Sequence, residues 1–567
     1  MRNTSRSKQR VGRGVMGGGQ NATMGSGGRA QWAQRLLLAG LLLLLAGAAP
    51  QPACSQVLTS QYDNSRTGCN PHETVLTPQN VNANQFGKLF SLQVDGAIYA
   101  QPLYMPGMEI PGKGTHNVVF VATEHDSVYA FDAEGSPPEP LWKVNFLNAG
   151  KGFRTVQARD VGCPFIQPEV GITSTPVIDL PSGTLYVLAR TKEKAGLLSD
   201  RYVQRLHALA VTTGVEKFGG PVEIRASLNS HAADSSNGQI EFEPLRENPR
   251  ASLLLANGNV YLTWASSCDV GPYHGWVMAY DAHTLAQVAA FNTSPDGDDG
   301  GVWAADTGPA ADREGSVFLA TGNGKFDASS GGRDYGDSVL KLAVAGRQLL
   351  VRDYFTPFNQ NELNVNDKDL GSGGPLLVPD QPGPHPHLLV ISGKGGTIYV
   401  LDRDHMGRYQ RGSDSQIVQS PPGGPDEDFG ASAYWNGHVY FIFTGDVPKD
   451  FALQHGRLSP NPLRGSRSFS DPGATPTVSA NGSKNGILWA LTSKHWNEPD
   501  GTAAVLYAFD ASNLVRELYN SEQNRDRDRA GIGLRFNIPM VVNGRVYVGA
   551  KRELDVYGLI SPPGKNR

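Results

Sequence analysis

The residues best suited to chemistry in this 567-residue chain are carboxylates, imidazoles and one indole that stand in expected loops and turns. Grouped around one cavity, such side chains can hold a metal ion, a sugar or a peptide. The candidates for a shared binding face are Glu124, His125, Asp126, Glu169, His274, Trp303 and Asp334. Each also has a purely structural interpretation, in which His125 and Asp126 form a tight turn and Asp334 ties down its glycine-rich loop. We expect the face as a whole to be the working surface, and we assign no residue a catalytic role.

Other motifs with a chemical meaning are weak in this sequence. The glycine turns "GNGKFD" at 322 and "GKGGT" at 393 lack the following helix that phosphate binding requires. The loop "SPDGDDGG" at 294 has the composition of a calcium loop, but its acidic residues have the wrong spacing for an EF-hand. We therefore predict a solvated loop there, no nucleotide site, and a metal site of unknown place if there is one.

These candidates are held by a unit that the chain repeats. Residues 116 to 135, "HNVVFVATEHDSVYAFDAEG", combine an apolar strand, a polar turn and a second apolar strand. Altered copies begin at 182, 257, 314, 387, 436, 485 and 543. Turns such as Asn-Gly before runs of β-branched and aromatic residues are strong hairpin signals. An extra strand precedes several copies, as in "STPVIDL" at 174 and "NIPMVVN" at 537.

The repeat predicts an all-β fold, an eight-bladed β-propeller of four-stranded blades. Stacked β-sandwiches are the alternative, but equivalent pieces recur throughout without a linker. The last copy ends at Leu559, with no room for a fourth strand, and residues 86 to 96 are placed to supply it. Such a closure removes an exposed sheet edge. Each unit is roughly 20 residues longer than a compact blade of about 40 to 45, so long loops are expected.

Propeller geometry assigns these loops to faces. The turn between the second and third strands of a blade lies on the same face as the connections between blades. His125 and Asp126 therefore share a face with the connections at 147–173, 266–275, 293–307, 322–338 and 357–373. Cys163 and Cys268 fall within this set, which predicts a disulfide between them. Two separate buried thiols, or a pairing with Cys69, are the alternatives.

The two ends of the chain differ in charge. Residues 1 to 53 carry seven basic side chains and no acidic one, whereas the remainder carries 43 basic and 54 acidic, a formal net charge of −11. An acidic body argues against nucleic-acid binding, which needs a basic surface. The apolar run at 36–49 has 14 residues, shorter than the roughly 20 that span a bilayer. Residues 1–53 thus resemble a signal peptide with a long basic leader.

We therefore expect export to the periplasm or the extracellular space. An uncleaved anchor, or a lipid on Cys54, is the alternative. The expected organisation is a signal peptide at 1–53, an N-terminal segment at 54–85, the propeller at 86–560 and a tail at 561–567. No membrane span is expected after cleavage, and the protein is expected to be a monomer.

The repeats also contain a degraded form of the docking motif of quinoprotein propellers, A-x-D-x-x-T-G-x-x-x-W. The stretch "ALAVTTGVEKF" at 208 keeps Ala208, Thr213 and Gly214 of the motif. In another copy, Asp132 and Trp142 match the acid and the tryptophan, with a proline-rich insertion between them. Together with "YAQPLYMPG", "EVGITSTPVID", "GRDYGDSVLKL" and "VLYAFDASNL", this pattern resembles the exported bacterial PQQ-binding-like β-propeller repeat proteins. In that resemblance the Asp caps a turn between outer strands and the aromatic residue packs against the neighbouring blade.

What the resemblance implies for activity is limited. Quinone dehydrogenases of this fold resemble one another in a ring of two adjacent cysteines, a Ca²⁺, a tryptophan under the quinone and an Asp base. This sequence has no adjacent cysteines and no haem-attachment motif. We therefore expect a non-catalytic binding propeller for a small molecule, glycan or protein, with no cofactor. A dehydrogenase dependent on PQQ and Ca²⁺ is one alternative, and a carbohydrate-binding or carbohydrate-active propeller is another.

Overall fold

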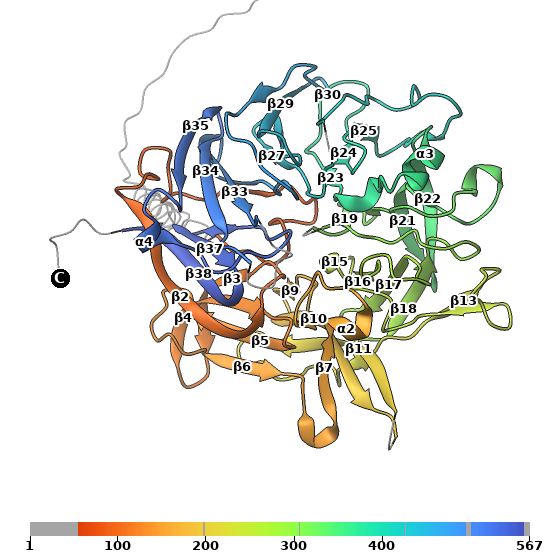
Figure 1. Ribbon diagram of the computed structural model, residues 1–567, viewed down its shortest axis with the longest axis horizontal. Helices are drawn as coiled ribbons and strands as arrows, with labels where there is room; N and C mark the ends of the chain where they lie inside the picture. Colours follow the sequence, from red (N-terminus) through yellow and green to blue (C-terminus); the bar gives the residue numbers. More distant parts are fainter. Residues whose placement is uncertain (1–54, 197–198, 306, 426, 495–500, 561–567) are drawn as a thin grey trace, which may run out of the picture. The chain divides into compact units, whose positions relative to one another are not determined.

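The computed structural model describes residues 55–196, 199–305, 307–425, 427–494 and 501–560, which belong to one compact unit, Cys54–Arg567. The predicted signal peptide, the lipid site at Cys54 and the C-terminal tail lie outside the described residues. Strands arranged about a common centre make up nearly all of the regular structure (Figure 1). Within the described part of the chain, no helix is long and apolar enough to cross a membrane.

The first half of the chain builds four large sheets and one small hairpin. The strands of the first two sheets are β3 (Leu103–Ile110), β4 (Gly114–Ala122), β5 (Ser127–Asp132) and β6 (Trp142–Asn145), then β7 (Phe153–Gln157), β8 (Glu169–Val170), β9 (Val177–Asp179), β10 (Thr184–Lys194), β11 (Asp200–Ala210) and β12 (Val222–Glu223). The hairpin β13 (Ser227–Asn229) with β14 (Gln239–Glu241) follows. The next two sheets contain β15 (Leu254–Ala256), β16 (Asn259–Thr263), β17 (Trp276–Asp281) and β18 (Gln287–Asn292), then β19 (Ala310–Ala311), β20 (Val317–Ala320), β21 (Val339–Ala345), β22 (Gln348–Thr356) and β26 (Arg408–Tyr409).

The second half builds four more sheets in the same way. Their strands are β23 (Leu376–Leu377), β24 (Leu388–Ser392) and β25 (Ile398–Asp402); β27 (Ala433–Trp435), β28 (His438–Phe441), β29 (Lys449–Gln454), β30 (Arg457–Leu458) and β31 (Leu463–Arg464); β1 (Cys69–Asn70), β32 (Thr477–Asn481), β33 (Lys484–Thr492), β34 (Val505–Asp510) and β35 (Asn513–Asn520); and β36 (Met540–Val542), β37 (Arg545–Gly549), β38 (Lys551–Leu559) and β2 (Phe86–Ala97). Helices are short: α2 (Ala158–Val161), α3 (Gln360–Val365) and α4 (Arg525–Asp528), with 3-10 turns at η1 (Ala149–Lys151), η2 (Ala328–Ser330) and η3 (Leu370–Ser372).

The core lies between neighbouring sheets. Strand β5 is buried along its whole length, as expected where both faces of a strand are covered. One hydrophobic cluster joins Val119 of β4 to Leu185 of β10 and Tyr547 of β37, and so links the first sheet to the second and to the last. Strand β2 lies antiparallel beside β38, with Phe86 opposite Leu559.

The degraded docking motif has the structural role that the resemblance implied. The indole of Trp142 donates a hydrogen bond from Nε1 to the carbonyl oxygen of Val211 in the next sheet, at 2.9 Å. A side chain at Gly214 would collide with this indole, since its Cβ would lie 2.8 Å from the ring. Asp132 accepts a hydrogen bond from the backbone N–H of Glu134 and caps the turn after β5.

An N-terminal strap, residues 55–70, crosses one end of the sheets. One strand in each of the eight large sheets contacts the strap, and we call these strands the lead strands: β3, β9, β15, β19, β23, β27, β32 and β36. The strap forms a hydrogen bond with every lead strand, through Tyr104, Ile178, Leu255, Ala311, Leu377, Tyr434, Val478 and Val541, at distances of 2.8 to 3.0 Å. This strap thus ties together strands that are separated by more than 400 residues of sequence.

Candidate functional site

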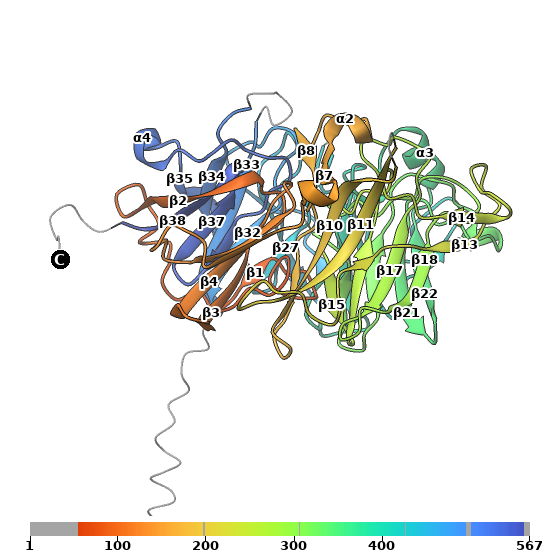
Figure 2. The same ribbon diagram turned by 90° about the horizontal axis from the view of Figure 1, so that it is seen from below.

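A central pocket of about 310 Å³ lies at the other end of the lead strands. Arg250, Phe429 and Phe536 line it, and in each case the residue five positions later (Leu255, Tyr434 and Val541) bonds to the strap. The pocket therefore lies on the N-terminal side of these lead strands, and the strap contacts the strands themselves. The helices α2, α3 and α4 lie on one side of the sheets in Figure 2, and Val161 of α2 lines the pocket.

One wall of the central pocket is cationic and aromatic. The guanidinium groups of Arg250 and Arg535 lie 4.5 and 4.4 Å from the ring centre of Phe536, and that of Arg535 is also 4.9 Å from the ring of Phe429. Burial, and then the positive charge of Arg250, lowers the pKa of Arg535 to about 10. The negative charges of Asp471 and Glu427 act on Arg535 in the opposite direction.

The pocket lining also carries carboxylates and one ammonium group, which lies 5.8 Å from the ring centre of Phe429. Lys394 Nζ lies 2.9 Å from the carboxylate of Asp367 and 2.5 Å from that of Asp369. Burial opposes the charge of Lys394, but these two partners raise its pKa. Burial, and then the charge of Asp369, raises the pKa of Asp269. The pocket lining therefore combines two arginines, one lysine and several carboxylates.

The predicted disulfide between Cys163 and Cys268 is confirmed, and it forms part of the pocket wall. It joins the connection after α2 to the β16–β17 loop, with the two Cα atoms 5.6 Å apart. Cys268 and Asp269 both have left-handed backbone conformations, at φ of 55° and 53°. Such conformations are unfavourable for residues with side chains and persist where surrounding structure enforces them. The crosslink thus fixes a strained loop at the pocket.

Trp303 is the only one of the seven predicted face residues that lines this pocket. Its Nε1 is buried and has no hydrogen-bond partner among the described residues. The ring packs edge-on to Tyr273, with centroids 6.1 Å apart. A buried indole N–H without a partner is costly, so this atom is a candidate donor to a bound molecule.

The predicted residues near 124 form a separate cluster. His125 Nδ1 lies 2.8 Å from a carboxylate oxygen of Glu169, so the structure brings these two together. Glu124 is 1% exposed and accepts hydrogen bonds from Gly171 N (2.6 Å) and Thr173 Oγ1 (3.2 Å). Burial raises the pKa of Glu124 to about 7. Asp126 is fully buried in a left-handed turn.

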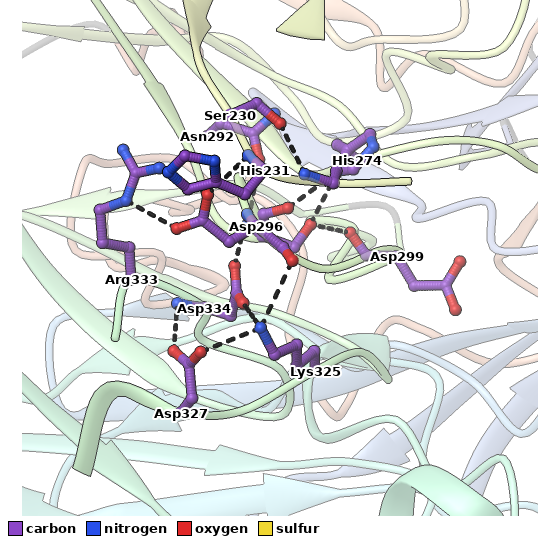
Figure 3. A network of polar contacts seen from close by, with 12 residues as sticks. Ser230, His231, His274, Asn292, Asp296, Asp299, Lys325, Asp327, Arg333 and Asp334 are labelled. Carbon is purple, nitrogen blue, oxygen red and sulfur yellow. Dashed lines mark hydrogen bonds and ion pairs between the residues drawn. The ribbon is translucent and has the colours of Figure 1, made fainter. Parts of the chain in front are cut away.

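The other two predicted residues belong to a network of loops shown in Figure 3. His274 is buried and contacts the carboxylate of Asp234 through Nε2 at 3.2 Å. Asp334 accepts a hydrogen bond from the backbone N–H of Asp296 and pairs with Lys325 at 2.7 Å. In this arrangement Asp334 ties the loop at 322–338 to the loop at 293–307.

The calcium-like loop at 294 is held by protein groups. Arg333 binds both carboxylate oxygens of Asp296, at 2.8 and 2.6 Å. Lys325 Nζ lies within 3.0 Å of the carboxylates of Asp327 and Asp334, so its ammonium group bridges the two acidic side chains (Figure 3). The loop is therefore pinned by ion pairs and is less solvated than predicted, although Asp298 is exposed. In the described ranges, no group of three or more His, Cys, Asp or Glu side chains is arranged to hold a metal ion.

Comparison with known proteins gives the fold. No protein-family model and no curated protein matches this sequence. A quinohemoprotein alcohol dehydrogenase, ADHIIG from Pseudomonas putida HK5, is 14% identical, over 91% of this chain and 82% of its own, with a TM-score of 0.55. A europium-containing methanol dehydrogenase is 14% identical, over 90% of this chain and 99% of its own, with a TM-score of 0.54. BamB from Moraxella catarrhalis overlaps less closely, at 12% identity, 83% of this chain, 99% of its own and a TM-score of 0.47.

The fold is a β-propeller of the quinoprotein type. The resemblance noted from the sequence is thus confirmed at the level of fold. Trp303 and the Cys163–Cys268 disulfide lie on the same pocket, although the two cysteines are 105 residues apart. The carboxylates of the described residues do not assemble the oxygen cage that Ca²⁺ prefers.

Four of the five long connections predicted for this face contribute to the pocket lining, but sequence reasoning missed its basic residues and Phe429. Arg250, Lys394, Phe429 and Arg535 stand outside those five connections. Each lies within a few residues of the start of a lead strand or in a hairpin turn. A search of every such position for charged and aromatic residues would have found them.

Proposed function

We propose that this chain is an exported β-propeller that binds a planar organic anion in its central pocket, without catalysing a reaction on it. The observation that carries the proposal is the pair of guanidinium groups, Arg250 and Arg535, stacked on Phe536 across a pocket that also contains Trp303. Guanidinium groups recognise carboxylates, and aromatic rings stack on planar ligands.

The architecture in this proposal is a monomeric ring of eight blades in which β2 completes the last blade. The pairing of β2 with β38 and the clusters that join neighbouring sheets support it. A disulfide that persists in the folded protein favours an oxidising compartment, which supports export to the periplasm or the extracellular space. A protein partner on the pocket side is compatible with this arrangement.

A ligand-dependent shift in melting temperature tests the proposal. The protein is heated with aromatic carboxylates such as naphthalene dicarboxylate, and with pyrroloquinoline quinone in the presence and absence of Ca²⁺. A ligand at 100 times its dissociation constant adds about 2.7 kcal/mol of stability. Arg535→Gln should abolish the shift, while Arg467→Gln, which changes a surface arginine paired with Glu517, should leave it intact. No shift with any planar anion would contradict the proposal.

A second candidate function is oxidation of an alcohol or sugar with a bound quinone. The shared position of Trp303 and the Cys163–Cys268 disulfide on one pocket favours it. Bound PQQ would supply two-electron oxidation of an alcohol. The residues of this chain would then hold the quinone carboxylates through Arg250 and Arg535 and cover its ring with Trp303. Quinone binding that requires Ca²⁺, with dye-linked alcohol oxidation, would replace the non-catalytic proposal by this one.

A further inference from the structure

A second cavity, of about 230 Å³, opens between the first and second sheets. It shares no lining residue with the central pocket. The residues that carry its chemistry are Phe146, Phe153, Thr191, Arg205, His207 and Glu216. Its volume is below the roughly 300 to 1,000 Å³ of pockets for drug-sized ligands, so it suits a smaller molecule.

A histidine–carboxylate pair forms the polar centre of this cavity. His207 is 5% exposed, and its Nδ1 lies 2.5 Å from a carboxylate oxygen of Glu216. Burial lowers the pKa of His207, so the ring is neutral and donates its Nδ1 proton to Glu216. The ring stacks on Phe146, with centroids 3.6 Å apart. Nε2 accepts no hydrogen bond within the described part of the chain, and as the basic nitrogen it can accept one from a ligand hydroxyl.

Arg205 on the cavity wall is already compensated, whereas Lys151, an exposed residue that also lines the cavity, forms no ion pair with the described residues. Arg205 donates hydrogen bonds from both of its terminal nitrogens to the carboxylate of Glu193, and its Nη1 also lies 3.4 Å from Thr191 Oγ1. The guanidinium covers the ring of Phe153 at 5.3 Å. An anionic ligand would have to compete with Glu193 for Arg205 and would face the carboxylate of Glu216. A neutral ligand avoids both, and it could bind His207 and Glu216 through its hydroxyl groups and the two phenylalanines through its apolar surfaces.

We propose that this flank cavity is a binding site for a single neutral saccharide unit. A sugar ring offers hydroxyl groups to His207 Nε2 and Glu216, and C–H surfaces to Phe146 and Phe153. The site is independent of the central pocket and of its ligand. The propeller would thus attach to a glycan through its flank while its pocket end binds an organic anion.

Long-range ¹H–¹⁵N spectra of the histidine rings of the full chain test this directly. The probes are D-glucose, D-galactose, D-mannose and N-acetyl-D-glucosamine, with D-glucuronate and inorganic phosphate as charged counterparts. We expect at least one neutral sugar to shift the His207 Nε2 resonance saturably. His207→Phe, which keeps the stacked ring, identifies the resonance and should weaken binding about tenfold or more, equivalent to about 1.4 kcal/mol.

Phe153→Ala provides a second variant at a partly exposed position, in case His207→Phe does not fold, and it should also weaken binding about tenfold. Arg535→Gln, in the central pocket, should leave sugar binding unchanged. The proposal is overturned if no neutral sugar shifts the resonance, if only glucuronate or phosphate does, or if sugar affinity is the same in Phe153→Ala as in the unaltered protein.

Discussion

The two ends of the lead strands are built from the same repeated unit but place their arginines in different surroundings. At the strap end, the fully buried Arg66 donates hydrogen bonds to Thr59 Oγ1 and to the carbonyl oxygens of Ser60, Leu253 and Pro309, at 2.8 to 3.2 Å. At the pocket end, Arg250 and Arg535 stand beside one another at the wall of a cavity.

This difference separates the end that stabilises the arrangement of the sheets from the end that contains the proposed ligand site. Hydrogen bonds from a buried charge to fixed carbonyl oxygens stabilise one arrangement of sheets. Crowded like charges destabilise the folded chain, and perturbed groups of this kind concentrate at functional sites. The strap end is thus a structural hub, and the proposed ligand site lies at the pocket end.

The largest effect should follow from removing the crosslink at the pocket end. In Cys163→Ser/Cys268→Ser the free energy of unfolding should fall by about 4 to 5 kcal/mol, because the disulfide closes a loop of 105 residues. Urea unfolding measures this. Cys69→Ala, which removes a buried free thiol, should cost about 1 kcal/mol. A loss below about 1 kcal/mol in the double variant would show that the crosslink adds nothing to the fold.

The next effect concerns the hub. Arg66→Met should lower the free energy of unfolding by roughly 3 kcal/mol or more, because it leaves four acceptors on the strap and two sheets without their donor. Arg313→Met, at an exposed position, should stay within about 0.5 kcal/mol. Equal stability of both variants in urea would remove the contrast between hub and pocket.

A third effect is a pH dependence of the free energy of unfolding caused by the buried Glu124. Burial raises the pKa of Glu124 to about 7 from 4.5. The unfolded chain loses this proton between pH 4.5 and 7 while the folded chain keeps it, so Glu124 lowers the free energy of unfolding by roughly 3 kcal/mol as pH rises through that window. Asp126, Glu247 and Arg190 share the site, so the difference between Glu124→Gln and the unaltered protein isolates the Glu124 part.

In Glu124→Gln, the unfolding midpoint should therefore depend less on pH between 4.5 and 7 than it does in the unaltered protein. Glu314→Gln, at an exposed position, serves as the control and should leave the pH profile unchanged. Identical pH profiles for Glu124→Gln and the unaltered protein would mean that Glu124 ionises normally in the folded chain.

The repeated hairpins made the fold predictable, because turn residues and apolar alternation are local signals that recur along the chain. The Cys163–Cys268 pair followed from the rule that assigns loops to faces. The strap was not predictable in this way, because six of the eight lead strands bond to its backbone groups, which leave no pattern in residues 55–70, and only the bonds to Leu255 and Val541 come from the side chains of Asn64 and Asn70. The pocket was only partly predictable, because its basic residues, Arg250, Lys394 and Arg535, come singly from three segments outside the five long connections.

The most direct test of the contrast is amide hydrogen exchange of the full chain with and without a planar anion, using pyrroloquinoline quinone as the first probe and naphthalene dicarboxylate as the second. We predict added protection in segments that carry the pocket lining, around Arg250, Phe429 and Phe536, and unchanged exchange in residues 55–70. Binding accompanied by protection at the strap and none around these three residues would contradict the proposed ligand site at the pocket end.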